Sequence, residues 1–135
     1  MNTSQLAGLG FAVAGTCVLD AKLKSGVRMV VHANREDRSI YAFVVDGDAK
    51  YIGICDSSAT CLSARMSRYQ GLMGAGTNKR IATLLRAALE ANQRVEILAW
   101  VPPGPVLVGQ LEVDLVKGLE NPLIALIKPE WNIHS

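Results

Sequence analysis

The sequence predicts an α+β fold in which a small central, mainly antiparallel sheet is flanked by helices. Two strand-like runs, residues 39–45 and 50–55, are joined by a segment that begins with Asp46-Gly47, a pair typical of a tight hairpin turn. Helical spacing is clearest in a run of apolar residues further on: Ile81, Leu84, Leu85, Ala88 and Leu89. The strand-helix-strand alternation of a doubly wound sheet is missing, which favours antiparallel pairing.

The chain of 135 residues is expected to form a single domain with its own core, because half of its residues are apolar. Residues 1–38 are expected to supply strands that lead into the domain. Residues 39–134 are expected to form the core that bears the functional motifs.

The apolar run over residues 5–19 is interpreted as a short glycine-rich lead-in followed by a buried strand over residues 11–19. No basic residue precedes it, as a signal peptide would require. Asp20 and Lys22 end it before the roughly 20 residues that a membrane-spanning helix needs. We therefore expect no membrane association. A second strand is expected over residues 23–31, with a turn or bulge at Ser25-Gly26.

Beyond the hairpin, helices alternate with loops and one more strand. Three glycines make residues 71–78 a predicted flexible loop, and four residues from Pro102 to Pro105 end the last strand. The final helix should be interrupted or kinked near Gly118 and Pro122. The predicted elements are helices over residues 62–70, 79–92 and 110–127 and a strand over residues 94–101.

Three cysteines, Cys17, Cys55 and Cys61, form no closely spaced pair. A sparse, odd set of this kind indicates reduced thiols in a cytoplasmic protein. A zinc site is not expected, because it would need four closely arranged ligands.

Basic residues concentrate in one part of the chain. Residues 62–95 hold six basic residues and one acidic residue, whereas the rest of the chain holds eight basic and eleven acidic residues. Such a segment could follow a phosphate backbone, or it could be an ordinary solvated helix face. Lys79 and Arg80 open a predicted helix after a glycine-rich loop, a position that suits contact with backbone phosphates.

The predicted hairpin brings two tyrosines, Tyr41 and Tyr51, close to each other on adjacent strands. Two phenols at one spot could orient a water molecule or a phosphate oxygen. The alternative is that both are simply tyrosines in strands, where this residue type is common.

The residues around and after the hairpin form an ordered set of motifs. They are Ser39-Ile40-Tyr41, Tyr51-Ile52-Gly53, Arg65 with Tyr69 four residues later, Glu120 followed by Asn121-Pro122-Leu123, and Trp131-Asn132-Ile133. This set resembles the GIY-YIG endonuclease family, and the small phage-type and restriction-type members above all. The resemblance covers roughly residues 39–134. It departs from the family pattern at Ser39, which replaces a glycine, and in the spacing from Gly53 to Arg65, which is longer by about one helical turn.

The resemblance implies a metal-dependent DNA endonuclease that hydrolyses phosphodiester bonds. This chemistry needs a positioned water, removal of its proton and stabilisation of the phosphoryl oxygens. By similarity, Tyr41 and Tyr51 orient or deprotonate the water, and Arg65 steadies the phosphate. Glu120 holds one divalent ion, Mg²⁺ or Mn²⁺. Asn132 supports the site, and the residues expected to lie against DNA are Gly53, Arg68, Tyr69, Lys79 and Arg80.

Two of these assignments have rivals nearby in the sequence. Glu120 is a carboxylate in an otherwise apolar stretch, but Glu112 and Asp114 fall on the same predicted helix. Asp114 is expected to pair with Lys117 at i+3. Glu112, about 80° from Glu120 around an ideal helix, could be its partner. Arg68 is the rival of Arg65.

Two other functions stay open at this stage. The chain could be a non-catalytic nucleic-acid-binding module on the same scaffold, or a small α/β binding protein whose motifs are core and turn residues. A nucleotide-binding loop is not indicated, because the glycines before Lys79 neither follow a strand nor end in Gly-Lys-Ser/Thr. For the endonuclease, double-stranded DNA is the expected partner. A homodimer or higher homo-oligomer is favoured because one site cuts one strand.

Overall fold

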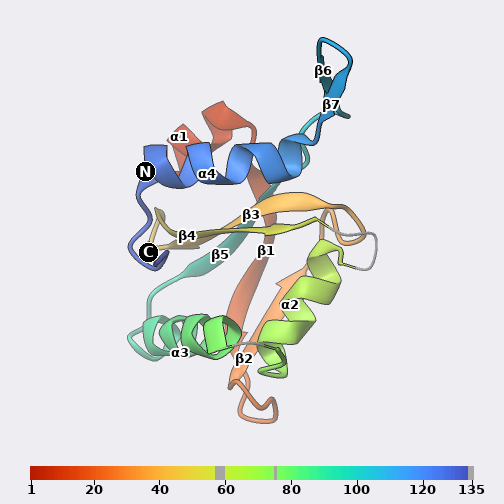
Figure 1. The fold of residues 1–135 in the computed structure, drawn as a ribbon. Helices are drawn as coiled ribbons and strands as arrows, with labels where there is room; N and C mark the ends of the chain where they lie inside the picture. The colour runs from red at the N-terminus through yellow and green to blue at the C-terminus, as the bar shows by residue number, and fades with distance from the viewer. Residues whose placement is uncertain (57–59, 75, 134–135) are drawn as a thin grey trace.

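The computed structural model describes residues 1–56, 60–74 and 76–133, which form a five-stranded antiparallel sheet, helices on both of its faces and a small separate hairpin (Figure 1). The predicted α+β class is confirmed. The elements in chain order are α1 (Thr3–Leu9), β1 (Ala12–Leu19), β2 (Val27–Val31), β3 (Ser39–Val45), β4 (Asp48–Cys55), α2 (Leu62–Gln70), α3 (Gly76–Glu90), β5 (Val95–Trp100), β6 (Val106–Val108), β7 (Leu111–Val113) and α4 (Leu115–Ile127).

The strand order in the main sheet is β2-β1-β5-β3-β4, and every neighbouring pair is antiparallel. The strand β5 is therefore central, and β4 lies at one edge. An edge strand presents one row of backbone groups outward, where other segments can reach it.

The β3–β4 hairpin forms as predicted. Asp46 and Gly47 both have positive φ, 47° and 80°, as the two central residues of a type I′ turn require. The register pairs Tyr41 with Gly53 and Phe43 with Tyr51. Both tyrosines thus point to the same face of the sheet, two residue pairs apart along the ladder.

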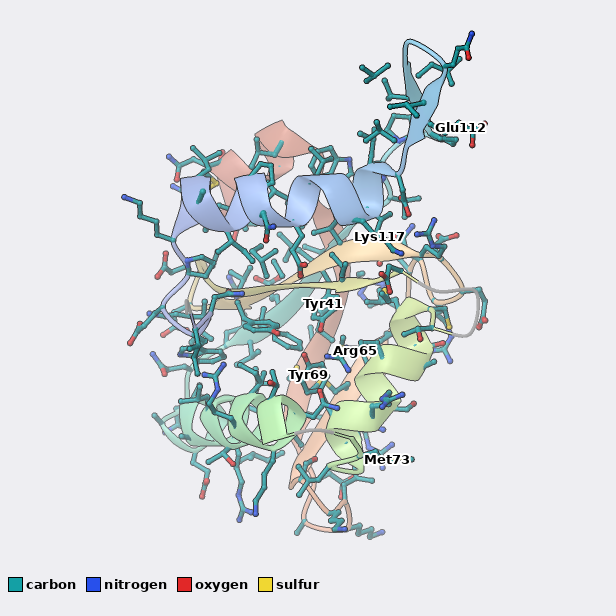
Figure 2. All side chains as sticks on the ribbon, in the orientation of Figure 1. Tyr41, Arg65, Tyr69, Met73, Glu112 and Lys117 are labelled. Carbon is teal, nitrogen blue, oxygen red and sulfur yellow. The ribbon has the colours of Figure 1, made fainter. Side chains whose placement is uncertain are left out.

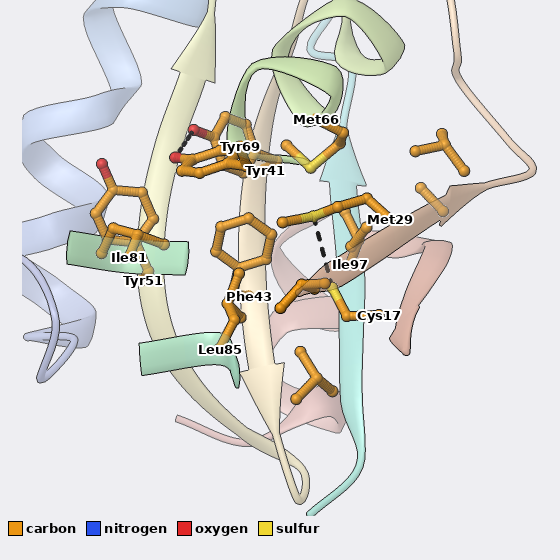
Figure 3. Close-up of a cluster of buried hydrophobic side chains, with 14 of the residues drawn as sticks. Cys17, Met29, Tyr41, Phe43, Tyr51, Met66, Tyr69, Ile81, Leu85 and Ile97 are labelled. Carbon is orange, nitrogen blue, oxygen red and sulfur yellow. Dashed lines mark hydrogen bonds between the residues drawn. The ribbon is translucent and has the colours of Figure 1, made fainter. Parts of the chain in front are cut away.

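Two hydrophobic layers enclose the sheet. The helices α2 and α3 cover the face that carries Tyr41, Phe43 and Tyr51, whose rings lie at the centre of the larger cluster (Figure 3). The helices α1 and α4 cover the opposite face, as Figure 1 shows above the sheet, with Leu6, Ile40 and Ile52 among the buried residues there. All seven positions of β3 are buried because both of its faces are covered. No helix within the described ranges has both the length and the apolar character needed to cross a membrane.

The N-terminal region departs from the prediction in two ways. Residues expected to be a lead-in form α1, which begins with a capping box in which Asn2 and Gln5 satisfy each other's backbone amides. The strand β1 was expected to be buried, but its outer face is exposed at Val13 and Val18. The reason is positional, since α1 and α4 lie over the β3–β4 side of the sheet and leave this part uncovered.

The prediction of one helix over residues 110–127 is wrong at its start. Residues 106–113 form the β6–β7 hairpin, with Gly109 at a φ of 63° in the turn. Asp114 then caps α4 by accepting a hydrogen bond from the Val116 amide at 3.0 Å. From there α4 continues through Gly118 and Pro122 to Ile127, without the expected interruption.

Three further predictions about these regions are wrong. Glu112 lies on the hairpin, away from Tyr41 and Arg65 in Figure 2, so it is not a partner of Glu120. Asp114 pairs with Arg38 at 2.5 Å rather than with Lys117, which lies 3.8 Å from Asp56. Part of the predicted glycine-rich loop is helical, because α3 begins at Gly76.

Candidate active site

Side chains from several elements converge at the β4 edge of the sheet. Tyr51 lies on β4, Arg65 on α2 and Glu120 on α4, so the three come from the edge strand and from both helical layers. Burial raises the pKa of the Tyr51 phenol, and the charges of Arg65, Glu120 and Arg80 also act on it. The Tyr51 phenol therefore lies within electrostatic range of these three charged groups.

The two motif tyrosines lie close together, as predicted. The ring centroids of Tyr41 and Tyr51 are 6.3 Å apart, and Phe43 stacks on Tyr51 at 6.0 Å. Tyr41 is 0% exposed, whereas Tyr51 retains 9%. Tyr51 is therefore the phenol that a ligand at the edge of the sheet can approach more readily.

Tyr41 is held in a buried hydrogen-bond network. Its hydroxyl lies 2.7 Å from the Tyr69 hydroxyl and accepts a hydrogen bond from Arg65 Nε at 3.2 Å (Figures 2 and 3). Burial raises the pKa of both phenols well above the ordinary tyrosine value. Both therefore stay neutral at physiological pH, and both contact the Arg65 side chain.

Arg65 is fixed by these tyrosines and Arg68 is not. The Arg65 guanidinium lies 5.0 Å from the centre of the Tyr69 ring, a cation–π distance, and the side chain is half-buried. Arg68 is exposed and lies beside Gly74. The longer segment after Gly53 thus still places Arg65, and not its rival, beside the tyrosine pair.

Gly53 makes room for the Tyr41 ring on the neighbouring strand. A Cβ added at Gly53 would lie 2.5 Å from Cζ and the hydroxyl oxygen of Tyr41. A glycine in a strand commonly marks such a close approach. Gly53 and Tyr69 are both buried, so their visible role is to shape the site around Tyr41.

Glu120 presents a half-buried carboxylate on α4. Burial raises the pKa of this carboxyl group, and the nearby charge of Asp56 raises it further. Within the described ranges no ion pair involves Glu120, and no group of three or more His, Cys, Asp or Glu residues gathers that could hold a metal. A single carboxylate still fits Mg²⁺, which keeps several waters and takes one or two carboxylates together with substrate phosphates.

Asn132 lies at the site, but it acts on backbone atoms. Its side-chain oxygen accepts a hydrogen bond from the Ile52 amide, and its Nδ2 donates to the Ile52 carbonyl oxygen, both at 3.0 Å. Asn132 thereby makes, along the outer edge of β4, the pair of hydrogen bonds that a neighbouring strand would make. The residue it holds lies between Tyr51 and Gly53.

The two basic residues at the start of α3 differ in their surroundings. Lys79 is exposed, whereas Arg80 is half-buried and donates to the Trp131 carbonyl oxygen at 2.8 Å. Sequence reasoning missed this link, and it also missed Asp56 as a neighbour of Glu120. No local pattern signals either one, because the partners lie 51 and 64 residues apart in the sequence.

Two solved structures share this fold over nearly the whole chain. A mutant of bacteriophage T4 EndoII matches with a TM-score of 0.74 and 19% identity, covering 98% of this chain and 99% of that chain. A restriction endonuclease in complex with product DNA matches with a TM-score of 0.54 and 18% identity, covering 93% of this chain and 79% of that chain. The chain has the fold of these endonucleases. The fold implied by the sequence resemblance is confirmed, while no family model and no curated protein matches the sequence.

Proposed function

We propose that the protein is a divalent-metal-dependent DNA endonuclease that hydrolyses phosphodiester bonds with a GIY-YIG-type active site. The observation that carries the proposal is the convergence of Tyr51, Arg65 and Glu120 at the β4 edge. A phenol, a fixed guanidinium and a partly desolvated carboxylate are the groups that this chemistry needs. The fold shared with two nucleases supports the same conclusion.

Arg65 is suited to binding the phosphate that is cut. Its guanidinium keeps its charge at any physiological pH and offers forked donors to phosphate oxygens. Because Tyr41 and Tyr69 hold it from one side, it is oriented before DNA binds. Preorganised charge of this kind stabilises the negative charge that develops on phosphoryl oxygens.

Glu120 would hold the divalent ion, Mg²⁺ or Mn²⁺, which when bound supplies charge neutralisation at the phosphate and a more acidic water. Tyr51 would orient the attacking water through its hydroxyl group. Its raised pKa favours the neutral phenol, so we assign it an orienting role rather than that of a strong base. Asn132 keeps the Tyr51–Gly53 stretch in place.

Double-stranded DNA is the proposed substrate, and exposed basic residues such as Arg68 and Lys79 would follow its backbone. Because each chain has one such site, cutting both strands calls for two copies, so we propose a homodimer or higher homo-oligomer. All three cysteines are free thiols, which fits a reducing compartment such as the cytoplasm.

The proposal is tested by incubating supercoiled plasmid with the protein and Mg²⁺, Mn²⁺ or a chelator. We expect nicked or linear plasmid with either metal and intact plasmid with the chelator. Glu120→Gln is the matched control for contaminating nucleases. Binding of a labelled duplex without any metal-dependent cutting would instead identify a non-catalytic DNA-binding module on the same scaffold.

A further inference from the structure

The segment after α4 lies along the outer edge of β4. The Trp131 amide donates to the Lys50 carbonyl oxygen at 2.8 Å, and Asn132 makes its two hydrogen bonds with Ile52. The Lys50 ammonium also lies 2.7 Å from the Glu130 carboxylate. Backbone groups that an edge strand would otherwise expose are therefore satisfied by Trp131 and Asn132.

Arg80 holds this segment from the opposite side. Its Nη2 donates to the Trp131 carbonyl oxygen at 2.8 Å, so the amide of Trp131 is bound to β4 and its carbonyl to α3. The Trp131 side chain is buried in the same hydrophobic cluster as Tyr41 and Tyr51. The peptide chain at Trp131 is thus anchored at three points, one residue before Asn132.

We infer that Arg80 is a positioning residue for catalysis, which keeps Asn132 on Ile52 and thereby fixes the Tyr51–Gly53 stretch of β4 against Arg65. The inference rests on the proposed function for its catalytic part. Its geometric part, the link from Arg80 through Trp131 and Asn132 to Ile52, stands on the hydrogen bonds alone.

The positions on either side of Ile52 explain why this link matters. Tyr51 carries the more accessible of the two motif phenols, and Gly53 leaves the room that the Tyr41 ring occupies. A small shift of the Ile52 peptide would move both. Misplacement by about 1 Å can lower a rate by about 100-fold.

The competing role for Arg80 is contact with a DNA phosphate. A phosphate contact contributes mainly to affinity, and its loss makes the salt dependence of binding shallower. A positioning residue contributes to the rate with bound DNA. The two roles therefore differ in the cutting rate at saturating DNA and in the stability of the hydrogen bonds at the β4 edge.

The experiment compares Arg80→Gln and Arg80→Lys with Arg86→Gln, which removes a charge from an exposed position on the same helix. Single-turnover nicking is measured at saturating DNA, and amide hydrogen exchange is measured at Ile52 and Trp131 by NMR. For Arg80→Gln we expect faster exchange at both amides and a rate lower by about 10- to 100-fold. Arg80→Lys, which keeps a donor, should restore part of the protection and part of the rate. Exchange at the two amides in Arg86→Gln should match that of the unmodified protein.

Two results would overturn the inference. Unchanged exchange with weaker binding would make Arg80 a phosphate contact, and faster exchange with an unchanged rate would make the link structural only. Thermal melting shows whether Arg80→Gln folds. If it does not fold, the same measurements on Arg80→Lys test the inference. If no variant and no unmodified protein cuts DNA, the proposed function fails, while hydrogen exchange still tests the link between Arg80 and the β4 edge.

Discussion

The β4 edge and the β6–β7 hairpin are two borders of β-structure that are held in different ways. At the β4 edge, α2, α4 and residues 130–132 fix the strand through buried rings, an ion pair and paired hydrogen bonds. The hairpin extends away from the body of the protein in Figure 1, and its side chains are exposed, with Leu107 at 65% and Leu111 at 72%. A two-stranded hairpin alone is marginally stable in water.

The difference shows where a precise site can be built. Orienting a guanidinium, a phenol and a carboxylate requires a backbone that neighbouring elements determine, and the β4 edge meets that requirement. The hairpin does not, and residues 101–113 contain neither Lys nor Arg that could bind phosphate. Substitutions at the two borders should therefore have effects of different size and kind.

The largest effect is expected for Glu120→Gln, which should abolish plasmid cutting and leave DNA binding largely intact, because it removes the only charge proposed to hold the metal. Without metal, Glu120→Gln should also be slightly more stable at neutral pH than the unmodified protein. The folded protein holds the Glu120 proton more tightly than the unfolded chain does, so the folded state loses stability as pH rises through the ordinary Glu pKa. Gln removes that loss. Nicking assays and denaturant unfolding check both statements, and cutting at the normal rate would remove Glu120 from the site.

A smaller but still large effect is expected for Arg65→Ala. Loss of a preorganised cation should lower the cutting rate by about 10²- to 10³-fold, as removal of one oxyanion donor does in other enzymes. Arg68→Ala is the matched control on the same helix. It should mainly weaken binding and reduce the slope of log affinity against log salt by about 0.9. Rates measured at saturating DNA separate the two variants, and the reverse ranking would show that Arg68 contacts the phosphate that is cut.

Gly53→Ala should destabilise the fold itself. The added methyl group would meet the Tyr41 ring at 2.5 Å, and overpacking of this kind costs about 1–3 kcal/mol. Tyr41→Leu relieves the contact, so the double variant should lose less stability than the sum of the two single variants. Urea unfolding of the four proteins measures this coupling. Strict additivity would mean that the ring and the new methyl group do not meet.

The parts of this fold that the sequence predicts are those set by local chemistry. The Asp46-Gly47 turn fixes the register of the hairpin, and the apolar spacing after Ile81 identifies α3. The same hairpin predicts that Tyr41 and Tyr51 lie close together, and the resemblance to a known family adds Arg65 to them. The structure brings them together in that way.

The parts that could not be predicted depend on contacts distant in the sequence or on competition between two local signals. Leu111 has helical i, i+4 spacing with Leu115 and Leu119, but it also alternates with Val113 as in a strand. The positive φ of Gly109 and the cap at Asp114 accompany the hairpin that forms. The position of Arg80 depends on Trp131, which lies 51 residues away. The exposure of Val18 depends on which strands α4 covers.

The smallest effect is expected at the hairpin. Leu107→Ser and Leu111→Thr replace exposed side chains far from the β4 edge, and surface changes of this kind usually alter stability by less than about 0.5 kcal/mol. Cutting at saturating DNA should also stay the same, because neither side chain contacts the proposed site. Thermal melting at two protein concentrations checks the prediction. A variant that carries both substitutions could instead melt at a lower temperature than the unmodified protein, with a difference in melting temperature that grows with protein concentration. That result would mean that a second copy of the chain covers the hairpin in solution. The two borders would then both be fixed by contacts, one within the chain and the other between copies.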